Sequence, residues 1–120
     1  MSRIMELAEQ LAQAIQEGPE FARLKKAQAK LAENTAAQIM YANFQKLALE
    51  LDKMRLAGEE IPPEKLEEVR KKYELLMFNE DIKDVMMAEA EISQMLLEVY
   101  HVLVRALGVL APQTPGTDKN

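Results

Sequence analysis

The chain has 120 residues, of which 48% are hydrophobic and 5% aromatic, with a formal net charge of −5 and no cysteine. This length fits a single domain, and the apolar residues are sufficient for an aliphatic and methionine-rich core. The absence of cysteine excludes disulfides, thiolate metal sites, cysteine-ligated iron–sulfur clusters and cysteine nucleophiles. The acidic balance argues against nucleic acid as a partner, because phosphate-backbone binding depends on Lys and Arg.

Nothing in the sequence indicates a membrane protein. No stretch approaches the roughly 18 uninterrupted apolar residues of a membrane span. The first residues carry acid and lack the apolar core of a signal peptide. We therefore predict a cytoplasmic protein without a membrane span.

Glycine and proline divide the chain into predicted helices. The first runs over residues 2–17, with Ser2 as its N-cap. Gly18 ends it, and Pro19 opens a second helix over 19–33. A third helix covers 35–57, where Thr35 and Gln38 form a predicted capping box and a left-handed Gly58 ends the helix.

The third helix carries apolar residues at alternating spacings of four and three. This heptad-like pattern is typical of a helix that packs along a seam. The seam residues, which we predict to lie in the core or an oligomer interface, are Met40, Phe44, Leu47, Leu51 and Met54.

A stiff turn at 59–63 precedes a fourth helix that ends near residue 77. Asn79 is the predicted N-cap of a fifth helix over 80–107, which would be about 42 Å long. This helix is apolar almost all round, whereas a surface helix normally shows one stripe. We therefore predict self-association, most simply as a twofold dimer. The main stripe, again assigned to core or interface, comprises Val85, Ile92, Leu96, Val99 and Leu103.

These elements predict an all-α fold, an oligomeric helical bundle of about five helices in which 35–57 and 80–107 are the two long ones. Residues 1–107 form one predicted domain. Residues 108–120 are rich in Pro, Thr and Gly, and we expect a disordered C-terminal tail.

Few residues indicate chemistry. Glu98 and His101 have the Glu-x-x-His spacing of di-iron bundles, which would need a second copy of the motif from another subunit because the chain has one histidine. The alternative is an ordinary contact on the helix surface. No phosphate loop or catalytic constellation is present, so we predict that the chain is not an enzyme and carries no cofactor.

Two charged features allow more than one interpretation. Glu89 falls on the apolar stripe of the fifth helix, where it could pair with a Lys or Arg across an interface and fix its register, or lie at the solvent edge. A catalytic role lacks a second carboxylate or base. The second helix has a basic face that could meet RNA or an acidic protein, although no aromatics interleave and a solvated face is favoured. Its members are Arg23, Lys25, Lys26 and Lys30.

Several short motifs in this order resemble the YlbF/YmcA family of small bacterial regulators, in particular a YheA-like branch. The similarity covers about residues 3–107. The motifs are Gly18-Pro19-Glu20-Phe21 with Leu24-Lys25, Asn43-Phe44, Ala57-Gly58-Glu59-Glu60-Ile61, Asn79-Glu80-Asp81-Ile82 and Ala88-Glu89.

The resemblance implies an all-helical cytoplasmic protein that forms dimers or larger oligomers. Better-studied members of the family resemble adaptors in a complex that affects competence, biofilm formation and sporulation, partly through a membrane-anchored ribonuclease. Some members hold iron–sulfur clusters through cysteines, and this property does not carry over to a chain without cysteine. The expected function is thus a homo-oligomeric regulatory adaptor whose partners are itself and other regulatory proteins or a ribonuclease complex. The alternatives are a metal-binding bundle with a shared Glu98/His101 site and, more weakly, RNA contact through the basic face.

Overall fold

The computed structural model describes residues 2–108, and the predicted tail beyond Gly108 lies outside this range. Within the described residues the fold is all-α, as predicted, with five helices and no strand. The helices are α1 Arg3–Gln16, α2 Pro19–Ala32, α3 Thr35–Leu56, α4 Pro63–Leu76 and α5 Glu80–Leu107. No helix within residues 2–108 is both long and apolar enough to cross a membrane.

Most helix ends follow the predicted capping residues. Ser2 Oγ accepts a hydrogen bond from the Met5 backbone N–H at 3.2 Å. Asn79 Oδ1 accepts one from the Ile82 N–H at 3.0 Å, which fixes the start of α5. Gly58 has a φ of 78°, in the left-handed region that glycine enters without a Cβ clash. These three predictions are confirmed.

The predicted cap of α3 was one residue late. Asn34, not Thr35, is the N-cap, and its Oδ1 accepts a hydrogen bond from the Ala37 N–H at 3.1 Å. Asn34 has the extended backbone of a cap residue, while Thr35 already lies within the helix. Both residue types are good caps, so the sequence alone does not separate the two positions.

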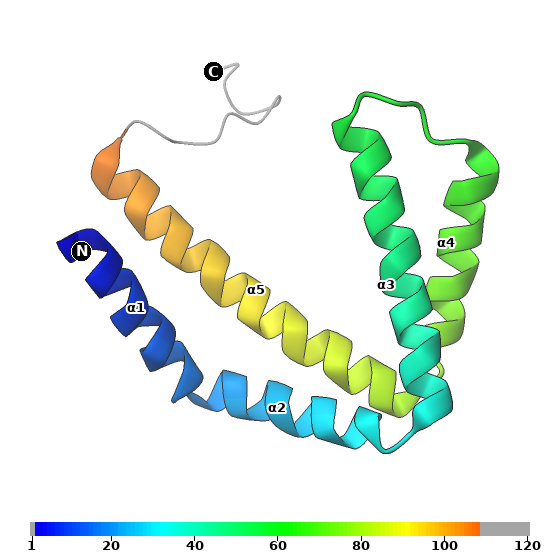
Figure 1. Ribbon diagram of the computed structural model, residues 1–120, viewed down its shortest axis with the longest axis horizontal. Coiled ribbons are helices and arrows are strands. Elements are labelled where there is room, and N and C mark those ends of the chain that lie inside the picture. The colour runs from blue at the N-terminus through cyan, green and yellow to red at the C-terminus, as the bar shows by residue number, and fades with distance from the viewer. Residues whose placement is uncertain (1, 109–120) are drawn as a thin grey trace.

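The helices form an open, angular shape. In Figure 1, α2 runs along the N-terminal half of α5, and α1 follows the C-terminal half, while the α3–α4 hairpin projects from the far end of α2 and the start of α5. The Cα radius of gyration is 18.1 Å, larger than the roughly 14 Å of a compact chain of this length. Within residues 2–108, much of the helix surface is therefore left uncovered.

The core lies at the junction where α2, the hairpin and the start of α5 meet. Ile82 at the start of α5 is fully buried, and Leu76 at the end of α4 is 1% exposed. The remaining buried members of this cluster are Leu31, Ala37, Tyr41 and Val85. Because these residues come from all three parts, the junction sets the angle between the hairpin and α5.

The residues predicted for the core or interface divide into three groups. Leu51 and Val85 are buried. Phe44, Leu47, Met54, Ile92 and Val99 are half-buried. Met40, Leu96 and Leu103 are exposed. A role for any of them in an oligomer stays a prediction at this point.

Candidate functional site

Helices α2 and α5 are antiparallel neighbours tied by one ion pair. Arg23 Nε donates to Glu91 Oε1 and its Nη2 donates to Glu91 Oε2, both at 2.9 Å. The hydrogen bond from Arg23, aided by its charge, lowers the pKa of the Glu91 carboxyl. Both side chains remain about half exposed, so the pair contributes little stability and mainly records the register of the two helices.

The predicted basic face of α2 is thus partly used inside the molecule. Besides Arg23, Lys25 Nζ lies 5.8 Å from the centroid of the Phe21 ring. Lys26 and Lys30 line a shallow groove of about 610 Å³ between α2 and α5. Acidic side chains of α5, Asp84 and Glu91, line the opposite wall of this groove. The groove therefore carries both signs of charge and does not form the continuous basic surface that RNA binding would use.

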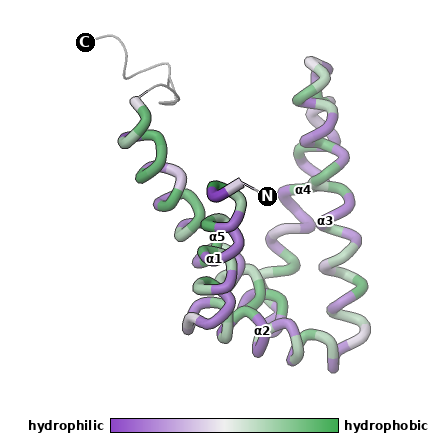
Figure 2. Tube along the Cα trace, turned by 60° about the vertical axis from the view of Figure 1, so that its left-hand side comes forward, coloured by the Kyte–Doolittle hydropathy of each residue, from purple (hydrophilic) through white to green (hydrophobic). Residues whose placement is uncertain are grey.

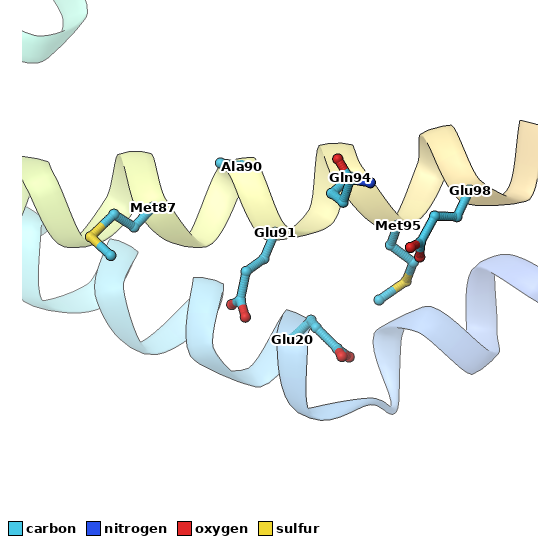
Figure 3. Close-up of a pocket in the computed structure, with 7 residues that line it drawn as sticks. All are labelled: Glu20, Met87, Ala90, Glu91, Gln94, Met95 and Glu98. Atoms are coloured by element: carbon cyan, nitrogen blue, oxygen red, sulfur yellow. The ribbon is translucent and has the colours of Figure 1, made fainter.

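A second hollow of about 510 Å³ lies where α2 begins (Figure 3). Glu20 enters it from α2, and the other lining residues come from α5. Glu91 and Glu98 are among them, as is Met95. The lining is acidic and contains no basic residue. It offers no nucleophile paired with a base, so it does not indicate a catalytic site.

Glu89 is held by a residue 48 positions away. Tyr41 Oη on α3 donates a 2.5 Å hydrogen bond to Glu89 Oε1 on α5. Both line a hollow of about 300 Å³ together with three glutamines, Gln28, Gln38 and Gln45. No ion pair among residues 2–108 brings a cation to Glu89. Its proposed register-fixing role across an interface stays a prediction, while its bond to Tyr41 braces the hairpin against α5.

The environment of Tyr41 gives a testable dependence on alkaline pH. Burial first, and then the hydrogen bond and charge of Glu89, raise the pKa of the phenol above its ordinary value of about 10. The folded state therefore keeps the proton to a higher pH than the unfolded state. The resulting stability is fully present below about pH 10 and declines as the pH rises above it.

We expect the wild type to lose on the order of 1 kcal/mol more unfolding free energy than Tyr41→Phe between pH 9 and pH 11. Denaturant unfolding of both proteins at the two pH values measures this difference. The variant controls for lysine titration, which affects both proteins. Equal losses in the two proteins would contradict the assigned environment of Tyr41.

Within residues 2–108, Glu98 and His101 gain no further ligands. Both are exposed on α5, and the His101 ring lies 6.2 Å, centroid to centroid, from that of Tyr100. Among residues 2–108, no group of three or more His, Asp or Glu side chains is arranged to hold a metal ion. A metal site built on Glu98 and His101 would therefore need its further ligands from another chain.

Exposed apolar side chains are the most prominent surface feature. They occur on α1, on the C-terminal half of α5 and on the hairpin, and Figure 2 shows hydrophobic segments along the outer half of α5. Monomeric proteins rarely expose large contiguous apolar patches, and such patches mark contact surfaces. The most exposed examples are Ile4 at 76%, Leu56 at 88% and Phe78 at 86%.

Two polar contacts between distant parts of the chain were not predicted. Glu91 was not singled out, and Tyr41 was not recognised as the partner of Glu89. A signal for the first exists, because an antiparallel pairing of Leu31 with Val85 and of Leu24 with Ile92 places Arg23 within two residues of the position opposite Glu91. That signal becomes readable only once α2 and α5 are known to be neighbours.

The described residues thus define a class: an all-helical protein with a small core and extensive apolar surface, without a recognisable catalytic centre. Comparison with known proteins narrows the class. The family described as "Control of competence regulator ComK, YlbF/YmcA" matches residues 4–108. The chain belongs to this YlbF/YmcA family, and the resemblance inferred from its motifs is confirmed.

Individual relatives agree with this assignment. The chain is 34% identical over 107 residues to a UPF0342 protein of Symbiobacterium thermophilum, covering 89% of this chain and 96% of the relative. It is 29% identical over 104 residues to a UPF0342 protein of Staphylococcus epidermidis, covering 87% and 91%. Among solved structures, a protein of unknown function (DUF964) from Bacillus stearothermophilus is similar, with a TM-score of 0.79, 29% identity and coverage of 91% and 96%.

Proposed function

We propose that this protein is a non-enzymatic, homo-oligomeric regulatory adaptor of the bacterial cytoplasm that acts through protein–protein contacts. The molecule has two arms, one formed by α1 and α5 and the other by the α3–α4 hairpin. The observation that carries the proposal is the exposed apolar surface on both arms. The family description, which refers to control of a competence regulator, supports a regulatory role. Partners of the expected kind are a second copy, other regulatory proteins and a ribonuclease complex.

The two arms suit two different contacts. The α1–α5 arm carries apolar residues along most of its length and supports self-association. The hairpin carries a separate pair on one face of α3, Leu49 at 54% and Leu56 at 88% exposure, seven residues apart. Residues seven apart lie on the same side of a helix, so this pair forms a small stripe that a partner protein can cover.

The oligomeric state is measured first, by light scattering on the purified chain at micromolar concentration. We expect a stable dimer or larger oligomer, and a monomer would refute the oligomeric part of the proposal. Partner contact is measured by affinity capture from the native cytoplasm with wild type, Leu49→Glu/Leu56→Glu and Ala29→Glu. Ala29 is exposed on α2, so its variant adds a carboxylate away from the hairpin.

An adaptor that uses the hairpin retains an identified regulatory protein or ribonuclease in wild type and Ala29→Glu and loses it in the hairpin variant. Equal recovery in all three proteins would refute the hairpin contact. Metal analysis of the same purified protein tests the alternative. Iron or manganese near one equivalent per chain, lost in Glu98→Ala/His101→Ala, would support the shared metal site as the function in place of the adaptor.

A further inference from the structure

The buried stripe of α5 continues, exposed, into its C-terminal half. Ile82 and Val85 lie on this face and are buried, and Ile92 is half-buried. Further along the same face, Leu96 is 51% exposed, Leu103 is 54% exposed and Leu107 is 59% exposed. An amphipathic helix normally buries such a stripe against a neighbour. In the first half of α5 the stripe is covered in this way, whereas in the second half it stays exposed within residues 2–108.

The C-terminal part of the stripe is exposed because α2 is shorter than α5. In the antiparallel register defined by Arg23 and Glu91, Pro19 at the start of α2 lies opposite Met95. Beyond Met95, α1 is the one helix of the described residues that follows α5, and no residue of α1 is buried. From Glu91 to Leu107, only Val104 is buried. The exposed part of α5 therefore begins opposite the first residue of α2.

The spacing of the exposed stripe is self-complementary. Its positions are Leu96, Tyr100, Leu103 and Leu107, separated by four, three and four residues, and this sequence of spacings reads the same in both directions. An antiparallel second copy of α5 would therefore place Leu96 opposite Leu107 and Tyr100 opposite Leu103, twice, around an axis between residues 101 and 102. A twofold interface requires this kind of self-matching patch.

The placement of charge leaves the stripe apolar, and steric constraints favour the antiparallel arrangement. Glu98 and Arg105, the charged residues between Ile92 and Leu107, lie on the opposite side of α5 from the stripe, since they are offset by two residues from Leu96 and Leu103. A parallel partner would continue along the N-terminal half of α5, where α2 and α3 already occupy this face. An antiparallel partner instead leaves α5 beyond Leu107 and meets neither helix.

We propose that the exposed stripe of α5, Leu96, Tyr100, Leu103 and Leu107, is the seam of a twofold dimer in which two α5 helices pair antiparallel. Helix α1 flanks this half of α5 (Figure 1), and its exposed apolar residues Ile4, Leu7 and Leu11 are the proposed margin of the interface. Seam and margin together supply the apolar surface for such an interface, which in a standard complex buries roughly 800 Å² per partner. The inference rests on the oligomeric part of the proposed function and names where the second copy sits.

The natural absence of cysteine allows a direct test of the geometry. Copies carrying Leu96→Cys are mixed with copies carrying Leu107→Cys and oxidised. In the antiparallel seam these two positions face each other, whereas each position is about 16 Å of helix away from its own counterpart, too far for a disulfide. We expect a disulfide-linked dimer in the mixture and none from either variant alone. Cross-linking of each variant alone would overturn the antiparallel seam.

A second pair of variants tests the energetics. Leu103→Glu buries two carboxylates without partners, one from each copy, and should weaken dimerisation at least about 100-fold in light scattering or sedimentation. Val102→Glu is the matched control, because Val102 is equally exposed at 54% but lies off the stripe, and it should leave the dimer intact. A wild-type dimer that survives Leu103→Glu and fails to cross-link overturns the seam while leaving the proposed function standing. A monomeric wild type overturns both.

Discussion

Leu76→Ala is expected to lower the free energy of unfolding by about 2–5 kcal/mol, the range for removing a buried leucine side chain and leaving a cavity. Leu76 is 1% exposed at the end of α4, where the hairpin meets α2 and α5. The surrounding helices approach from different directions, so the site has little freedom to collapse around the missing atoms. Denaturant unfolding followed by circular dichroism measures the change.

The neighbouring residue is a close control. Leu75→Ala makes the same chemical change in the same helix, with the same change in helix propensity, but Leu75 is 62% exposed. We expect a loss within about 0.5 kcal/mol. If the two variants lose equal stability, the core is not centred on the junction, and the hairpin is held to α5 by other contacts.

The second large effect is expected at the hydrogen bond between Tyr41 of the hairpin and Glu89 of α5. Tyr41→Phe removes the donor to Glu89 and leaves a half-buried carboxylate without it, at an expected cost of about 1.5–3 kcal/mol. Glu89→Met removes the charge instead, and in the double variant neither group needs a partner. The double variant should therefore be more stable than the sum of the single effects predicts, with a coupling of about 1–2 kcal/mol.

Additive effects, within about 0.3 kcal/mol, would show that the Tyr41–Glu89 hydrogen bond does not stabilise the junction. Light scattering on Glu89→Met addresses the register-fixing role predicted for Glu89. Loss of the dimer in a variant that remains folded would support that role, and an unchanged dimer would confine Glu89 to its own chain.

Local features of the chain were predictable because each depends on few neighbouring residues. Gly58 needs a left-handed backbone and Asn79 accepts a bond from a residue three positions away, so both helix boundaries follow from the sequence. The choice between Asn34 and Thr35 as the cap of α3 failed because both of these adjacent residues are of types that cap helices.

Long-range contacts were not predictable in the same way. Tyr41 and Glu89 are 48 residues apart, and Arg23 and Glu91 are 68 apart. Which polar groups meet depends on the angle between the hairpin and α5, and apolar packing at the junction sets that angle. The periodicity of α5 correctly indicated a helix that needs neighbours on more than one side. It did not show that one half of its stripe is covered by α2 and the other half is left open.

Helix α5 is a continuous rod of 28 residues from its Asn79 cap to Gly108. In an antiparallel pair centred between residues 101 and 102, each Ile82 would lie about 29 Å from the axis, so the bases of the two hairpins would stand roughly 60 Å apart. Such a dimer presents its two hairpins as widely separated binding sites facing opposite ways. It would hold tightly only a target that offers two matching sites at that distance, such as another symmetric assembly, because only simultaneous engagement multiplies the affinity of a weak single contact.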